Sequence, residues 1–239
     1  SRAPVIIQIV GSCTDVALAG RLRPDLFASS CKAVYLNAGA AHPGKTGQLE
    51  YNVTLNPGAY AAIFDLSCPV YWCPCWDQSG EHTVGPHGTW YSFRQGDLFA
   101  RLTDPLCQFF LYMLNRSTDP QYLRELRRPV DPGLREAFGA KPRNMWSTAA
   151  ILHAAGIGVD TQGGLHPGGQ PADPLFGFIP VTVACADDGQ TTWTPAAAGS
   201  NRHLFQVRRP ERYPAAMTAA LGTLLETLGA DPEPPLDVL

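Results

Sequence analysis

Near its beginning the chain carries the run Pro4-Val5-Ile6-Ile7-Gln8-Ile9-Val10, which ends at Gly11. Five of these residues are β-branched, and the run lacks the apolar–polar alternation of a strand with one wet face. This pattern predicts a central strand of a parallel sheet, buried on both faces. It decides the fold, because such a strand requires neighbouring strands on both sides and helices above and below the sheet.

The two segments that follow complete a strand–helix–strand unit. Residues 14–22 have helical periodicity, and Lys32-Ala33-Val34-Tyr35-Leu36-Asn37 form a second apolar run. A helix between two strands joins them in parallel with a right-handed crossover. We therefore expect the strands at 5–10 and 33–37 to be adjacent and buried.

Further elements extend this pattern along the chain. Asn56 and Pro57 are typical of a helix cap and a first helical residue. A long loop at 76–91 follows the next apolar strand, and the remaining predicted elements are helical segments over 97–138, 144–155 and 214–228 and strands at 178–184, 191–193 and 204–207. The sequence predicts one α/β domain over 1–230 with an open, mainly parallel sheet, and a loose tail at 231–239.

Composition narrows the class of protein. Hydrophobic residues make up 45% of the chain and charged residues 16%, which is typical of a folded protein. The net charge is −3, and no basic run exceeds Arg127-Arg128, so we expect no nucleic-acid partner. No apolar stretch reaches the roughly 20 residues of a membrane span, and residues 1–8 lack the order of a signal peptide. We expect a cytoplasmic protein without membrane contact, whose seven cysteines are reduced thiols.

Two local motifs carry a resemblance to a known family. The stretch 11–19, Gly-Ser-Cys-Thr-Asp-Val-Ala-Leu-Ala, resembles the strand-to-helix turn of the inosine/uridine-preferring nucleoside hydrolases. The stretch 50–59, Glu-Tyr-Asn-Val-Thr-Leu-Asn-Pro-Gly-Ala, resembles their Glu-Phe-Asn element. This resemblance implies an active site at the carboxyl ends of the strands, as is general for such sheets. It also implies hydrolysis of the N-glycosidic bond of ribonucleosides with a calcium ion held by aspartates.

The resemblance assigns roles to four residues. Thr14 maps to a backbone calcium ligand, Asn37 to a residue whose main chain approaches the sugar, and Glu50 with Asn52 to ribose contacts. From the residues alone, Glu50 and Asn52 would share a face if the chain were extended there, which suits a vicinal diol. An ordinary polar loop is the alternative for this pair, and a helix cap is the alternative for Thr14. We expect all four residues to converge on one cleft.

The chain also departs from the family. It lacks the family's Asp-x-Asp-x-x-x-Asp-Asp motif, and Trp146 and its neighbours stand where a His-Asp pair is usual. Trp146 would either stack on a nucleobase or fill the core. His42, in the loop before Glu50, is the candidate acid for the leaving base.

The missing Asp motif and the missing first strands of the family imply a partner chain or segment that supplies them. The apolar strand at 5–10 would aggregate as an open edge. We therefore expect the missing strands to come from a companion chain or from a cleaved N-terminal segment, with a newly sealed sheet as the third alternative, and we expect an oligomer. Calcium would bind only if aspartates come from outside this chain. Three functions remain open: an N-glycosidase completed from outside, a ribose-binding protein without catalysis, and an assembly subunit.

Overall fold

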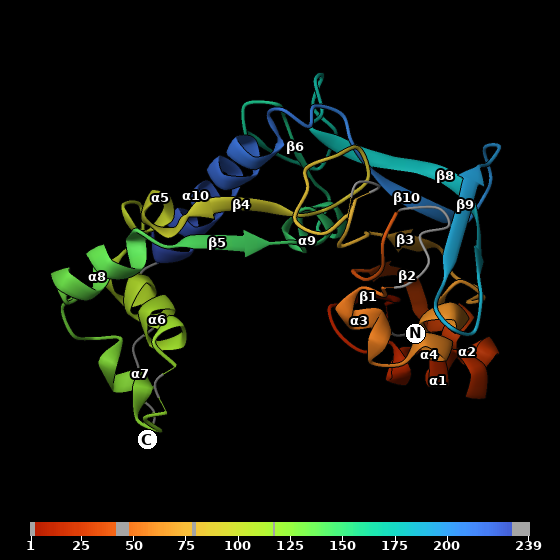
Figure 1. Cartoon of the computed structure of the whole chain (residues 1–239), viewed down its shortest axis with the longest axis horizontal. Helices are drawn as coiled ribbons and strands as arrows, with labels where there is room; N and C mark the ends of the chain where they lie inside the picture. The colour runs from red at the N-terminus through yellow and green to blue at the C-terminus, as the bar shows by residue number, and fades with distance from the viewer. Residues whose placement is uncertain (1–2, 42–47, 78–79, 117, 231–239) are drawn as a thin grey trace.

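The structure is a computed structural model that describes residues 3–41, 48–77, 80–116 and 118–230, and the predicted tail at 231–239 lies outside these residues. One mixed sheet organises the fold (Figure 1). Its strands, in spatial order, are β1 (Val5–Ile9), β2 (Cys31–Leu36), β3 (Val70–Trp72), β10 (Arg202–Val207), β8 (Phe176–Cys185) and β9 (Thr191–Pro195). The first four strands run parallel to one another, β8 runs antiparallel to β10, and β9 runs antiparallel to β8. The predicted mainly parallel α/β sheet is confirmed.

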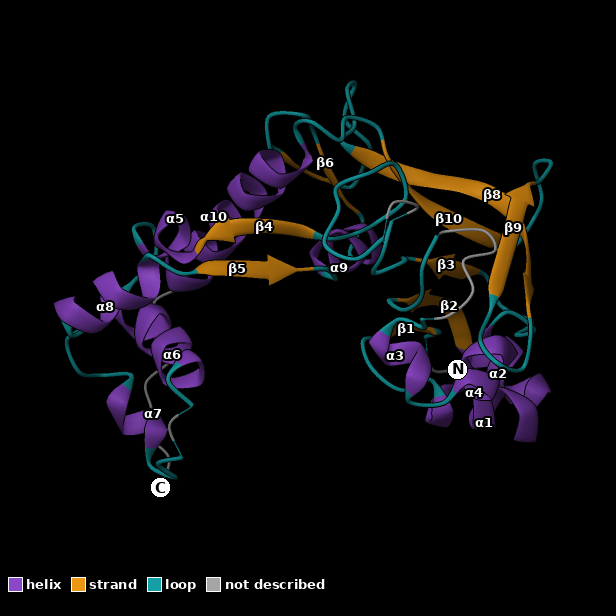
Figure 2. Ribbon diagram, in the orientation of Figure 1, coloured by secondary structure: helices purple, strands orange, loops and turns teal. Residues whose placement is uncertain are grey.

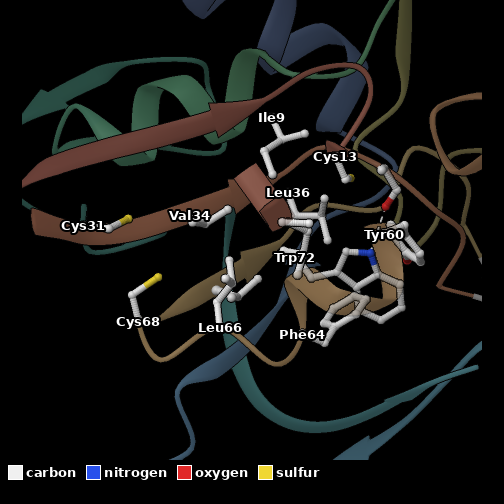
Figure 3. Packing of buried hydrophobic residues seen from close by; sticks show 14 of the residues in the cluster. Ile9, Cys13, Cys31, Val34, Leu36, Tyr60, Phe64, Leu66, Cys68 and Trp72 are labelled. Carbon is white, nitrogen blue, oxygen red and sulfur yellow. Dashed lines mark hydrogen bonds between the residues drawn. The ribbon is translucent and has the colours of Figure 1, made fainter. Parts of the chain in front are cut away.

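Four helices cover one face of the parallel strands: α1 (Thr14–Leu22), α2 (Pro24–Ser30), α3 (Tyr51–Thr54) and α4 (Pro57–Ile63). The predicted cap of α4 is confirmed, because the Asn56 side chain accepts a hydrogen bond from the Ala59 amide at 3.0 Å. Between sheet and helices lies an apolar cluster that includes Val34, Leu36 and Trp72 (Figure 3). This packing holds the carboxyl ends of β2 and β3 in place.

The strand β1 differs from its prediction. It pairs in parallel with β2, as expected, but it forms the edge of the sheet over the described residues. The exposed fractions of the Val5, Ile6 and Val10 side chains are 55%, 37% and 60%, so the expectation of a central strand buried on both faces is wrong. The β-branched run indicates that this segment forms a strand. Whether the strand is buried depends on a second neighbouring strand, which the run itself does not specify.

The other face of the sheet is covered by α9 (Thr148–Ala154). Here Tyr35, Tyr71 and His203 stack side by side across β2, β3 and β10, with ring centroids 4.7 Å apart in each pair. The predicted helix at 144–155 is partly wrong, because Asn144 and Met145 belong to β5 (Pro142–Met145), which pairs with β4 (Tyr91–Arg94). A single segment carries no sign of this long-range pairing.

A second region extends away from the sheet (Figure 2). We call it the arm, and it comprises the antiparallel strand pair β4–β5, α5 (Gln95–Phe99), α6 (Asp104–Leu114), α7 (Tyr122–Glu125), α8 (Pro132–Gly139) and α10 (Tyr213–Ala230). Apolar side chains from α5, α6, α8 and α10 form its core. A short hairpin of β6 (Ile157–Val159) and β7 (Leu165–Pro167) lies between α9 and β8 along the chain. Across the described ranges, no helix is long and apolar enough to cross a membrane.

Candidate functional site

The Glu50 carboxylate is fixed at the carboxyl end of β2. Glu50 precedes α3 and caps it, with Oε1 accepting a hydrogen bond from the Asn52 amide at 3.0 Å. Its other oxygen, Oε2, accepts from the Gly39 amide at 2.8 Å. Only 6% of the residue is exposed. The Gly39 and Asn52 amides, with the Val53 amide as a third donor, therefore hold this buried acceptor in one orientation.

Gly39 allows this arrangement. Its φ of +86° lies in the left-handed region, and a Cβ at this position would collide with the Tyr60 hydroxyl. Glycine is the residue that adopts this conformation and tolerates this contact without strain. The turn after β2 can thus present the Gly39 amide to Glu50.

Asn52 and Asn37 connect the Glu50 turn to the sheet. The Asn52 side chain donates to the Asn37 carbonyl at 3.0 Å, so its amide is used inside the protein. Asn52 lies in α3, and the extended geometry considered for the Glu50–Asn52 pair does not occur. The Asn37 amide donates to the Ile9 carbonyl at 3.1 Å and to Gln8 Oε1 at 3.2 Å, while its Oδ1 is buried and has no hydrogen-bond partner among the described residues.

Burial is the main influence on the pKa of Glu50. It raises the pKa because the charged carboxylate loses water, and the hydrogen bonds from the Gly39, Asn52 and Val53 amides oppose this effect. The nearby Glu81 carboxylate raises the pKa further. Glu50 therefore holds its proton more tightly than an exposed glutamate does.

A cavity of about 480 Å³ opens beside Glu50. Its polar and aromatic lining comes from the loop after β3 and from the β8–β9 turn, with Trp76, Glu81, Gln190 and Thr191 among the lining residues. Gly189, with a φ of +86°, lets this turn pack against Val53 below the cavity. The volume lies in the range of small-molecule sites.

Asp77 anchors the loop that forms one wall. Its Oδ1 accepts hydrogen bonds from the His87 amide at 2.8 Å and the Gly88 amide at 3.0 Å, and only 1% of the residue is exposed. The position of Trp76 and Glu81 thus depends on a buried carboxylate. Sequence reasoning missed Trp76 and Gln190 as lining residues, although the length of the loop and the turn at 189–191 were the available signals.

Thr14 belongs to a separate group of side chains. Its hydroxyl contacts Ser12 Oγ at 2.9 Å and accepts from the Asn56 side chain at 2.9 Å, and it is exposed at the start of α1. No hydrogen bond joins it to Glu50, Asn37 or Asn52 among the described interactions. The neighbouring Cys13 does face Glu50, and burial together with that charge raises the pKa of its thiol to about 12.

Of the other two predicted site residues, the structure describes Trp146 but not His42. Trp146 is half-buried beside His82, with ring centroids 5.9 Å apart, and His82 in turn lies 5.6 Å from Trp90. The indole Nε1 atoms of both tryptophans are buried without a described partner. This aromatic group adjoins Glu81 through His82. His42 lies outside the described residues.

The described acidic side chains do not gather into a cluster that fits a calcium ion. Within the part of the chain that the structure describes, no group of three or more His, Cys, Asp or Glu side chains is placed to hold a metal. Calcium takes six to eight oxygen ligands. We therefore derive no chemical step through a metal from these residues.

Comparison with known proteins gives resemblances of fold. No model of a protein family matches the chain, and no curated protein matches its sequence. Similar solved structures include an inosine-uridine preferring nucleoside hydrolase from Bacillus anthracis, with 13% identity and a TM-score of 0.37 over 92% of this chain. A plant nucleoside hydrolase has 15% identity and a TM-score of 0.43 over 91%, and a purine-preferring ribonucleoside hydrolase from Gardnerella vaginalis has 10% and 0.44 over 93%. This chain covers 62%, 61% and 61% of those chains.

Proposed function

We propose that the cavity beside Glu50 binds a ribonucleoside, and that this chain supplies the sugar-binding part of an N-glycosidase completed by residues from outside it. The observation that carries the proposal is the buried Glu50 carboxylate, held by backbone amides at the wall of a 480 Å³ cavity. A carboxylate has about four acceptor positions on its two oxygens, so Glu50 retains capacity for ligand donors. A vicinal diol presents two such donors.

The remaining lining suits the rest of a nucleoside. Trp76 offers an aromatic surface for a base, and the Gln190 amide offers both a donor and an acceptor. Glu81 and Glu50 make the cavity acidic, which disfavours phosphorylated ligands. A neutral nucleoside therefore fits this lining better than a nucleotide does.

In this proposal the chain binds and orients the sugar and does not cleave the bond alone. Cleavage passes through a cationic, oxocarbenium-like sugar and needs an activated water and a stabilised leaving base. Glu50 is committed to the sugar hydroxyls, and Asn52 positions the turn at Asn37 without touching the ligand. The aspartates, and any calcium that they hold, come from a companion chain or an N-terminal segment.

The exposed edge at β1 supports such a partner. Val5 and Ile6 in β1, and Val10 directly after it, present apolar side chains to solvent, and among the described residues β1 pairs with β2 alone. A strand added beside β1 would cover these side chains. We propose that the missing part of the site arrives by this edge.

Calorimetry with inosine and uridine tests the binding. We expect Glu50→Gln to weaken binding by about 10- to 100-fold, which is about 1.4–2.7 kcal/mol, because the amide presents a donor where the diol needs an acceptor. The control is Glu136→Gln, an exposed glutamate on α8. Equal affinities for inosine and 2′-deoxyinosine would refute diol recognition.

Release of the free base tests the need for outside residues. We expect no turnover of inosine by the chain alone and turnover only after an Asp-bearing partner is added. Binding without turnover under both conditions would identify a nucleoside-binding protein without catalysis. Turnover by the chain alone that disappears in Glu50→Gln would contradict the proposed division of the site.

A further inference from the structure

Two of the seven cysteines lie together at the amino ends of neighbouring strands. Cys31 is the first residue of β2, and Cys68 comes two residues before β3. The strands are parallel and paired at Val34 and Val70, so these ends meet at one edge of the sheet. Both sulfur atoms lie at the same end of the apolar cluster in Figure 3. We propose that Cys31 and Cys68 form a reversible disulfide when the protein meets a small oxidised disulfide.

The two thiols interact and are not equivalent. Cys31 donates a hydrogen bond to the Ala33 carbonyl at 3.5 Å and also hydrogen-bonds Cys68. Burial raises the pKa of the Cys31 thiol to about 12, and the neighbouring Cys68 adds to this shift. Burial also raises the pKa of Cys68, but the hydrogen bond from Cys31 opposes the rise. In this proposal Cys68 is therefore the attacking sulfur.

Arg202 strengthens this difference. Its guanidinium donates to the Cys68 carbonyl at 3.1 Å and to the Phe64 carbonyl at 2.7 Å, which fixes it against the loop before β3. Its positive charge lowers the pKa of the Cys68 thiol. Cationic neighbours of this kind distinguish reactive thiols from inert buried ones.

Other cysteine pairs lack this combination. Cys185 acts electrostatically on Cys13, but burial and nearby acidic groups raise the pKa values of both thiols. Burial raises the pKa of Cys73, and burial together with Glu50 raises that of Cys75. Among the described residues, no arginine lowers the pKa of these four thiols.

The reaction balances with a small disulfide as oxidant. The Cys68 thiolate attacks one sulfur of the small disulfide, breaks its S–S bond and releases one thiolate. Cys31 then loses its proton and attacks the Cys68 sulfur of the mixed disulfide, which releases the second thiolate. The two protons of the cysteine pair end on the two released thiols. The pair is oxidised by two electrons, and the small disulfide is reduced by two.

Access requires only a local opening. Both side chains are buried, but Ser30, Lys32 and Ser67 beside them in the chain are exposed. The segment between Cys31 and Cys68 contains Asn37, Gly39, Glu50 and Asn52. A disulfide would therefore join the two ends of the segment that carries the Glu50 network, and would stabilise it against unfolding.

The test is equilibration of the whole chain with glutathione and glutathione disulfide, followed by trapping of free thiols and peptide mapping. We expect a linked peptide pair containing Cys31 and Cys68, and an oxidised protein that unfolds at higher urea concentration than the reduced one. Linkage of other cysteines in preference, or no linkage at any glutathione ratio, would overturn the proposal.

Variants test the assigned roles. In Cys31→Ser we expect a glutathione adduct to accumulate on Cys68, whereas in Cys68→Ser we expect at least tenfold less adduct on Cys31. Both should lose the urea shift, and Cys107→Ser in the arm should keep the link. Equal adducts on both cysteines would contradict the order of attack. If a variant fails to fold, peptide mapping of the parent protein after equilibration with glutathione still tests whether the Cys31–Cys68 disulfide forms.

Discussion

The region around Glu50 and the arm bury different kinds of side chain. Near the carboxyl ends of β2 and β3, Asn37, Glu50 and Asp77 are buried and held by backbone hydrogen bonds. The arm buries mainly apolar side chains, and its cavity of about 140 Å³ is lined by residues such as Phe99, Leu102 and Phe110. Buried polar groups are costly unless they are satisfied, so their concentration at one place marks a site. The buried side chains of the arm mainly contribute apolar packing.

The ionisable groups show the same contrast. Glu50 is buried and its pKa is raised, whereas Glu226 on α10 is exposed and receives two hydrogen bonds from Arg101, at 2.7 and 2.8 Å. The bonds from Arg101 lower the pKa of Glu226. Burial thus disfavours the charged form of Glu50 in the site. The ion pair with Arg101 favours the charged form of Glu226 in the arm.

The largest expected effect comes from removing a core side chain in each region. Trp72→Ala should lower the free energy of unfolding by about 3–5 kcal/mol and Leu111→Ala by about 2–5 kcal/mol, because both side chains are buried. Trp72 also donates to the Ala38 carbonyl at 2.9 Å, next to Gly39. Urea denaturation and calorimetry should show that Trp72→Ala loses inosine binding and that Leu111→Ala keeps it. Loss of binding in both variants would show that the regions are coupled.

A pair of glycine substitutions separates backbone strain from contact in the site. Gly168→Ala should cost about 1 kcal/mol, because its φ is +81° and its surroundings are open. Gly39→Ala should cost more, since the same strain is joined by a collision with Tyr60, and it should also weaken inosine binding. Equal losses in urea denaturation would mean that Tyr60 moves aside freely.

The two glutamates should give opposite pH dependences of stability. The folded protein holds the Glu50 proton more tightly than the unfolded chain, so the contribution of Glu50 to the free energy of unfolding should fall as pH rises above 4.5. Glu226 has a lowered pKa, so its contribution should be present above 4.5 and lost as pH falls through the folded value. Urea titrations of Glu50→Gln and Glu226→Gln against the parent protein measure both. If both contributions to the free energy of unfolding changed with pH in the same direction, the expected difference between Glu50 and Glu226 would be wrong.

The smallest effect on stability is expected at the sheet edge. Val10→Lys should change the free energy of unfolding by less than about 0.5 kcal/mol, because the side chain is 60% exposed. It should nevertheless reduce association through β1, since a charge on an edge opposes strand addition. Light scattering over a concentration series checks this. Unchanged self-association would place the contact elsewhere, and a monomeric parent protein would rule out self-association through this edge.

Local signals in the sequence determined several elements. The apolar spacing at 14–22 predicts α1 with its observed bounds, and Asn56 with Pro57 predicts the start of α4. The order of strands and helices indicates a parallel sheet, whereas the role of Glu50 in a site at the carboxyl end of β2 rests on the family resemblance of residues 50–59 and stays a prediction. These features depend on side chains within a few residues of one another, so a single sequence displays them.

Only the tertiary structure decided the rest. β3 pairs with β10, whose residues lie more than a hundred positions further along the chain, and the β8–β9 turn brings Gln190 to the cavity beside Glu50. The edge position of β1, the pairing of β4 with β5 and the hydrogen bond from the Asn52 side chain to the Asn37 carbonyl arise in the same way. Pairing, burial and hydrogen-bond partners are set by segments distant in sequence, and periodicity along one segment does not specify which distant segment will meet it.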